Sequence, residues 1–135
     1  MKNIFAICTM LSLLLSCAVQ SGGVSAKDIA AKTYVLQSVN GVEFAGKERT
    51  PEIQFNETLW VTGQVCNRFM GQGTLQGDVL TVPEMASTMM FCADPQLNDM
   101  EREFASLLRQ GAKVSLRGNA LSLSNGTTTY RYNAR

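Results

Sequence analysis

The chain has 135 residues, 45% of them hydrophobic and 17% charged, which is typical of one globular domain. Its 12 basic and 11 acidic residues nearly cancel, so it lacks the clustered positive charge of a nucleic-acid-binding protein. The sequence has no histidine, which excludes histidine-dependent catalytic triads and histidine-containing metal sites. We therefore expect no nucleic-acid partner, no metal and no cofactor.

The N-terminus has the pattern of a targeting segment. Lys2 supplies a short positive region, and the apolar run 4–15 has the length of a signal peptide but is too short to span a membrane. Residues 14–17 (Leu-Leu-Ser-Cys) resemble a bacterial lipobox, and cleavage there would leave Cys17 as a lipidated N-terminus. The alternative is ordinary cleavage after Ala26, which would release a soluble periplasmic protein.

The lipobox interpretation divides the chain into three parts. Residues 1–16 are a lipoprotein-type signal peptide, 17–30 are the lipidated cysteine with a flexible Ser/Gly-rich tether, and 31–135 are the folded domain. Removing Lys2 from the 12 basic residues leaves 11, equal to the 11 acidic ones. A neutral mature protein would attach to the membrane through acyl chains on Cys17 and not through a polybasic surface.

Most of the domain shows the period-two pattern of β-strands. Asn40-Gly41 and Asn56-Glu57 are expected to turn the chain between early strands. Near the C-terminus, two further turns divide a three-stranded meander with one half-buried face. The predicted strands are 33–39, 52–55, 58–65, a hairpin within 73–82, and the meander strands around 112–117, 121–123 and 127–133.

One amphipathic helix is predicted over residues 94–110. Asp94 is a good N-cap, Pro95 suits the first helical position, and Gly111 stands just past the end. Apolar residues recur between them at helical spacing. Strands, one helix and then more strands indicate an α+β domain with an antiparallel sheet curled around the helix.

The cysteines favour one disulfide bond. Cys8 leaves with the signal peptide and Cys17 is consumed if lipidated, so Cys66 and Cys92 remain as an even pair in an oxidising compartment. A bond between them would close a loop of about 27 residues and contribute roughly 3.5 kcal/mol in the chain-entropy treatment. Two buried free thiols and a redox-active pair are the alternatives, whereas two cysteines cannot complete an all-cysteine zinc site.

Two short motifs carry a resemblance to a known family. They are Gly63-x-x-Cys66-Asn67-Arg68-Phe69-x-Gly71 and Thr88-x-Met90-x-Cys92, followed by an acidic helix. In this order and spacing the chain resembles the META domain family, and within it the bacterial heat-inducible lipoprotein (HslJ) family, from about Thr33 to Tyr132. It departs from the usual pattern at Val65, Gly73 and Phe91.

The resemblance implies a small α+β domain with a strongly curved sheet, an envelope location and a link to heat or envelope stress. It implies no known catalytic activity. The motif residues without a known role in the family are Asn67, Arg68, Phe69, Gly71, Thr88 and Met90. In the predicted turn at Cys66-Asn67-Arg68, we expect Asn67 to tolerate a left-handed backbone, Arg68 to meet carbonyls or a carboxylate, and Phe69 to fold onto the core.

Three functions are compatible with the sequence. The first is a non-enzymatic, monomeric lipoprotein that faces the periplasm, chiefly from the outer membrane, and binds a protein or envelope component. The second is a binder of hydrophobic small molecules, suggested by the adaptable side chains of Met85, Met89, Met90 and Met100. The third is a thiol–disulfide enzyme using the cysteine pair.

Carboxylate pairs such as Glu101 with Glu103 are interpreted as solvated surface.

Overall fold

Residues 23–135 are described by the structure, a computed structural model. The predicted signal peptide, Cys17 and the first part of the predicted tether lie outside the described residues. The described chain runs through two helices and eleven strands: α1 (Ala26–Ile29), β1 (Thr33–Val39), β2 (Val42–Glu43), β3 (Glu52–Phe55), β4 (Trp60–Gln64), β5 (Arg68–Gln72), β6 (Thr74–Gln76), β7 (Val79–Thr81), β8 (Met85–Ser87), α2 (Pro95–Gln110), β9 (Ala112–Arg117), β10 (Ala120–Ser124) and β11 (Thr129–Ala134).

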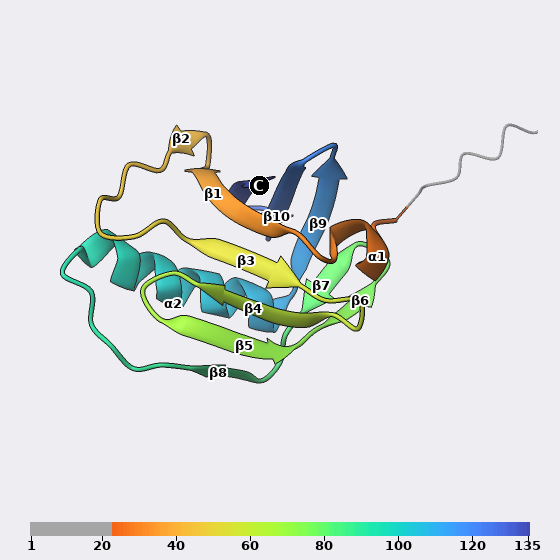
Figure 1. Ribbon diagram of the computed structural model, residues 1–135, viewed down its shortest axis with the longest axis horizontal. Helices are drawn as coiled ribbons and strands as arrows, with labels where there is room; N and C mark the ends of the chain where they lie inside the picture. Colours follow the sequence, from red (N-terminus) through yellow and green to blue (C-terminus); the bar gives the residue numbers. More distant parts are fainter. Residues whose placement is uncertain (1–22) are drawn as a thin grey trace, which may run out of the picture.

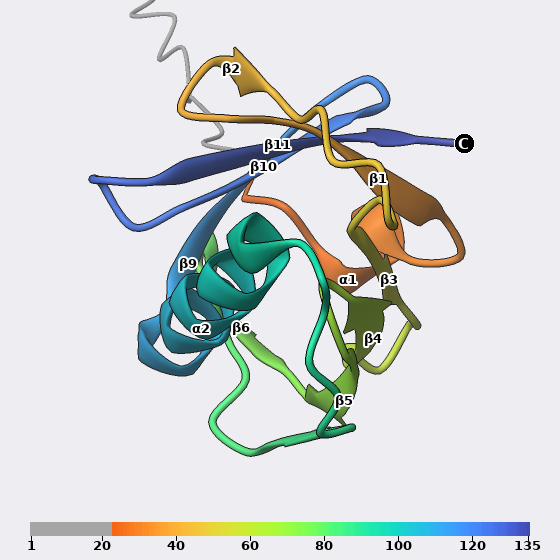
Figure 2. The ribbon, with the colours of Figure 1, turned by 90° about the vertical axis from the view of Figure 1, so that its left-hand side faces the viewer.

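All strands join one antiparallel sheet that curls around α2 (Figure 1 and Figure 2). The strand order is β6-β7-β9-β10-β11-β1-β3-β4-β5-β8, and β2 pairs with β1 beside this path. The first and last long strands, β1 and β11, are therefore neighbours in the middle of the sheet. The observed architecture confirms the predicted α+β class with a strongly curved sheet.

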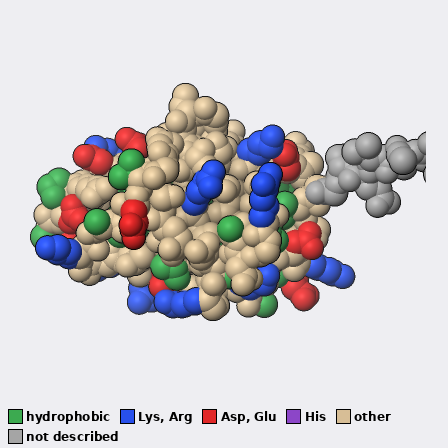
Figure 3. Space-filling model, turned by 90° about the horizontal axis from the view of Figure 1, so that it is seen from above, with side chains coloured by type: hydrophobic (Ala, Val, Ile, Leu, Met, Phe, Trp, Pro, Cys, Tyr) green, Lys and Arg blue, Asp and Glu red, His purple; other side chains and the backbone are tan. Residues whose placement is uncertain are grey.

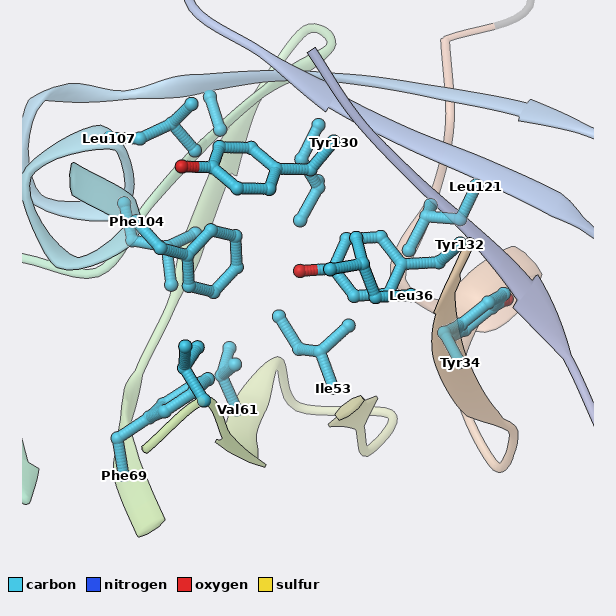
Figure 4. Close-up of a cluster of buried hydrophobic side chains, with 14 of the residues drawn as sticks. Tyr34, Leu36, Ile53, Val61, Phe69, Phe104, Leu107, Leu121, Tyr130 and Tyr132 are labelled. Atoms are coloured by element: carbon cyan, nitrogen blue, oxygen red, sulfur yellow. The ribbon is translucent and has the colours of Figure 1, made fainter. Parts of the chain in front are cut away.

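The predicted helix is present as α2. The Asp94 side chain accepts a hydrogen bond from the Gln96 N–H at 2.9 Å, and the helix ends at Gly111 with φ +117°. The apolar stripe faces the sheet, and the Phe104 ring is 2% exposed. Figure 4 shows this ring among aromatic side chains from both halves of the sheet: its centroid lies 5.0 Å from that of Tyr130 and 5.9 Å from that of Phe69.

The predicted turns also match the structure. Asn40 and Gly41 adopt left-handed conformations (φ 50° and 78°) between β1 and β2. The Asn56 side-chain oxygen accepts hydrogen bonds from the backbone N–H groups of Thr58 and Trp60, at 3.0 and 2.7 Å, and so turns the chain between β3 and β4. Short polar side chains thus fix these corners locally, as the sequence indicates.

Three strands of the sheet, β2, β5 and β8, were not predicted. β5 occupies the stretch that the sequence suggests is a turn, and β8 occupies a stretch assigned to no element. Gly71 lies inside β5, where no larger residue would fit. A Cβ at this position would stand 2.6 Å from the Glu84 carbonyl oxygen and 2.7 Å from Val82 Cγ1. Glycine serves a close approach of two chain segments here, and not a turn.

The predicted tether over 17–30 is wrong at its C-terminal end. Ala26–Ile29 form α1, and the Ile29 side chain is fully buried in the core. The backbone N–H and the hydroxyl of Ser25 each donate to Asp28 Oδ2 at 2.7 Å, and these bonds lower the pKa of Asp28. The folded domain thus begins before residue 31. The buried Ile29 side chain packs this segment against the core, and the Ser25–Asp28 hydrogen bonds stabilise the first turn of α1.

Gly63 provides the first test of the fold. A Cβ at Gly63 would lie 2.4 Å from the Glu52 carbonyl oxygen and 2.5 Å from Phe69 Cζ. We expect Gly63→Ala to lower the free energy of unfolding by about 3 kcal/mol, because both neighbours must move. Gly77→Ala is the control: Gly77 has φ +60° with nothing within 4 Å of its Cβ position, so it should cost only about 1 kcal/mol of backbone strain. Equal losses in urea unfolding would contradict the steric account.

The buried tyrosines predict a pH dependence. The hydroxyls of Tyr34 and Tyr130 are buried without a partner among the described residues, and burial raises the pKa of Tyr130 from 10.0 to about 12. Burial also raises the pKa of Tyr132 well above its usual value. Because the folded state holds these protons more tightly, their contribution to stability is complete below pH ~10 and is lost as the pH rises toward ~12.

Tyr130→Phe separates this effect from general alkaline unfolding. The variant should be at least as stable as the wild type at pH 7, since it removes an unpaired buried hydroxyl. It should also lose less stability between pH 9 and 11.5 in urea titrations, because one of the shifted groups is gone. A steeper alkaline loss in the variant would show that this hydroxyl does not titrate as described.

Candidate functional site

Three of the motif residues, Asn67, Thr88 and Met90, meet at one buried polar junction. Asn67 is 5% exposed and lies in the turn between β4 and β5. Its side-chain amide donates to the Met90 carbonyl oxygen (3.0 Å) and to Glu101 Oε2 (2.7 Å). Its side-chain oxygen accepts from the Met90 N–H (2.6 Å) and the Thr88 hydroxyl (3.0 Å). The amide group therefore uses both donors and both acceptor positions within the protein.

Glu101 joins this junction from α2. Its Oε1 accepts the backbone N–H of Asn67 at 2.6 Å, and the residue is half-buried. The sequence-based interpretation of Glu101 as solvated surface is therefore wrong, whereas Glu103 is exposed. No sequence signal identifies this contact, because the two partners are 34 positions apart in the chain.

Backbone contacts along residues 88–92 alternate. The N–H of Thr88 donates to the Arg68 carbonyl oxygen at 3.0 Å, and Met90 is held on both its N–H and its carbonyl by Asn67. Cys92 is held in the same way by the Asn98 side chain, at 3.1 and 2.9 Å. Every second residue of Thr88-x-Met90-x-Cys92 therefore forms backbone hydrogen bonds to the rest of the domain. This alternation is typical of an extended chain.

A disulfide bond closes the junction. Cys66 and Cys92 are bonded, with Cα atoms 5.8 Å apart, and they are 0% and 3% exposed. The bond links the β4–β5 turn to the segment that leads into α2, and Arg49 Nη1 donates to the Cys66 carbonyl oxygen at 2.6 Å beside it. Neither sulfur is presented to an external thiol, so this geometry suits a structural bond better than a redox centre.

The other residues of the turn differ in burial and in backbone conformation. Phe69 folds onto the core, where it is 6% exposed. Arg68 is exposed, and its guanidinium forms no hydrogen bond or ion pair with any other described residue. Asn67 has no left-handed backbone, contrary to the prediction, since Ala31, Asn40 and Leu59 are the non-glycine residues with positive φ in 23–135. The side chain of Asn67, and not its backbone, shapes the corner.

The methionines proposed to line a ligand pocket do not surround one cavity. Met100 is 7% exposed in the core, whereas Met89 and Met90 are 98% and 59% exposed at the surface. The outer face of β3, β4 and β5 carries an open groove of about 440 Å³, lined by polar side chains such as Gln54 and Thr62 together with Phe69 and Met70. Among residues 23–135 there is no group of three or more Cys, Asp or Glu placed to hold a metal, and no helix long and apolar enough to cross a membrane.

Comparison with known proteins identifies the family of this chain. Residues 27–134 match the META domain family. The chain belongs to the META domain family. This META-domain protein is 35% identical over 133 residues to heat shock protein HslJ of Escherichia coli (strain K12), across 98% of this chain and 95% of HslJ. The likeness supports a heat-shock-related function.

Two solved structures are similar to this META domain. One solution NMR structure has 37% sequence identity and a TM-score of 0.74, and the match covers 82% of this chain and 94% of that one. The NMR structure of a protein from Burkholderia xenovorans has 18% identity and a TM-score of 0.64, with 82% and 86% covered. The second likeness shows the fold alone.

The Asn67 junction generates a stability prediction. Asn67→Ala leaves the Met90 N–H, the Thr88 hydroxyl and the Glu101 carboxylate without their buried partner, so we expect a loss of about 3 kcal/mol in urea unfolding. Arg68→Ala, at the neighbouring exposed position, should cost less than about 0.5 kcal/mol. Amide hydrogen exchange at Met90 should accelerate in the first variant only. Unchanged exchange at Met90 would show that Asn67 does not hold this segment.

Proposed function

We propose that this protein is a non-enzymatic lipoprotein of the cell envelope that supports tolerance to heat or envelope stress by binding a protein or another envelope component. The observation that carries the proposal is the occupation of the motif side chains. The amide of Asn67 is fully bonded, and both sulfurs are buried in one disulfide. The motif therefore supplies shape and not a reactive group. The name of the relative HslJ supports the link to heat stress.

The N-terminal region of the fold favours the lipobox over the alternative cleavage site. Cleavage after Ala26 would cut inside α1. It would remove Ser25, the N-cap residue that donates to Asp28, together with Val24, which packs against the core. Cleavage before Cys17 would keep all of these contacts. On the face shown in Figure 3, basic and acidic side chains are interspersed, which agrees with attachment through acyl chains and not through a basic surface.

The proposal therefore places the protein on the periplasmic side of the envelope, chiefly at the outer membrane, as a monomer anchored at Cys17. Its partner would be a protein or envelope component and not a nucleic acid. Small-molecule binding and thiol exchange are weaker candidates, because the methionines do not gather around one cavity and the cysteines are not accessible.

The intact mass of the membrane-derived protein tests the anchor. We expect the mass of residues 17–135 plus acyl chains, rising by about two daltons on reduction because a disulfide takes up two protons. Cys17→Ala should move the protein from the membrane fraction to the soluble fraction, whereas Cys8→Ala, in the part of the signal that is removed, should not. A mature mass beginning at Lys27 would overturn the lipoprotein assignment.

Survival after a heat shift tests the role in stress. A strain without the protein should survive less well, and expression of the wild-type chain should restore survival. The soluble Cys17→Ala variant should restore it poorly if the anchored position matters. Equal survival with and without the protein, under heat and under other envelope stress, would refute the stress function.

A further inference from the structure

The segment 85–93 is an unprotected margin of the sheet. β8 is the last strand in the strand order, and residues 85–93 contain no charged residue, no proline and no glycine. Natural proteins usually protect an edge strand with such residues, because its free backbone groups invite pairing with another chain. Within the same segment Met89 is 98% exposed and Phe91 89% exposed. An exposed apolar patch beside a free strand edge marks a binding surface.

The backbone of this segment has one bonded side and one open side. In the β5–β8 pairing, Met70 lies opposite Ala86, and the N–H of Thr88 donates to the Arg68 carbonyl. Antiparallel ladders alternate, so the even-numbered residues face β5 and the odd-numbered ones face outward. The N–H and carbonyl groups of Met85 and Ser87 therefore point away from the sheet. Beyond β8, the backbone groups of Met89 and Phe91 have no hydrogen-bond partner among the described residues.

The Asn67 junction lengthens this open side beyond β8 itself. β5 begins at Arg68, just after the turn from β4, yet the Asn67 side chain in that turn bonds both the N–H and the carbonyl of Met90 as a strand residue would. Asn98 does the same for Cys92. Two side-chain amides thus continue the inner ladder and keep residues 85–91, which we call the open edge, extended and available.

We propose that the open edge binds an extended, uncharged segment of another polypeptide by strand addition. The proposal rests on the protein-binding role proposed above and names the surface and the partner's chemistry. The row of outward backbone groups requires an extended backbone, which neither a lipid nor a compact small molecule offers. The polarizable, unbranched side chain of Met89 and the ring of Phe91 would cover apolar side chains of varied shape.

The position of the open edge disfavours the N-terminal segment and the bilayer as its occupants. The first described residues, Gly23 and Val24, lie beside Gly77 and Asp78. Figure 1 shows α1 at one end of the domain and the chain after β8 running toward the other end, where α2 begins. Residues 18–22 cannot span more than about 20 Å even if fully extended, so an anchor at Cys17 would stay near the α1 end of the domain, away from the end toward which the open edge runs.

The size of the open edge disfavours a second copy of the chain. A stable protein–protein interface uses about 20–30 residues on each side, whereas residues 85–91 form one short segment. A short edge with adaptable apolar side chains suits transient capture of a peptide segment, as a protein unfolded by heat would offer.

A labelled peptide tests the proposal directly. The probe is a fluorescent peptide of alternating Val and Thr, about as long as the open edge, titrated by anisotropy against the full mature chain carrying Cys17→Ala so that it is soluble. We expect saturable binding that weakens at least tenfold when alternate peptide bonds of the probe are N-methylated, because methylation removes the donors that a strand requires. A probe of alternating Glu and Thr should not bind.

Variants locate the site. Met89→Lys or Phe91→Lys should weaken binding at least tenfold, because a charge on an exposed edge blocks strand addition. Val42→Lys is the matched control, since Val42 is 72% exposed on the distant strand β2 and should leave binding unchanged. Wild-type affinity in the Met89→Lys variant, equal binding of the N-methylated probe, or self-association of the unliganded protein through residues 84–93 would each overturn the proposal.

These outcomes are separable from those of the proposed function. The peptide titration uses a chain without the anchor, so a protein that proves not to be lipidated can still bind the probe. Conversely, the acylated Met89→Lys variant can be tested for whether it restores heat survival as well as the wild type does. Full restoration would support the envelope role and overturn the open edge as the binding surface.

Discussion

The ring of Phe104 connects the two halves of the domain. It projects from the single long helix into the hollow of the sheet, where it contacts Tyr130 and Tyr132 of β11 on one side and Phe69 of β5 on the other. One helix cannot cover a flat sheet of this width, so the sheet must curl until both halves reach the same apolar stripe. The curvature of the strands, the close contact at Gly63 and the position of the β4–β5 turn all follow from this demand.

The family motif contributes at two levels of this arrangement. Gly63, Phe69 and Gly71 allow β4 and β5 to approach their neighbours and complete the core. Asn67, Thr88 and the disulfide instead hold a surface segment in an extended form by bonding its alternate residues from the inside. A motif without a reactive group can therefore still specify a functional surface, because it determines which backbone groups remain free.

Local signals in the sequence are enough to predict α2, the early turns and the C-terminal meander, since caps, Asn-Gly pairs and apolar periodicity all act within a few residues. β5 and β8 lack such signals: glycine interrupts one, and the other has no alternation of polar and apolar residues. The role of Asn67 is invisible for a related reason, because its partners Thr88, Met90 and Glu101 lie 21 to 34 positions away. The Ser/Gly-rich composition before residue 31 likewise conceals α1, whose place depends on the burial of Ile29.

The pairing of β1 with β11 also determines when the domain can form. Tyr34 lies opposite Ala134, so the middle of the sheet joins residues about 100 positions apart, and such long-range contacts form slowly. A chain emerging from the ribosome cannot complete this pairing until its last strand is available. Truncation of the final few residues would therefore split the sheet at its centre and not merely shorten its margin.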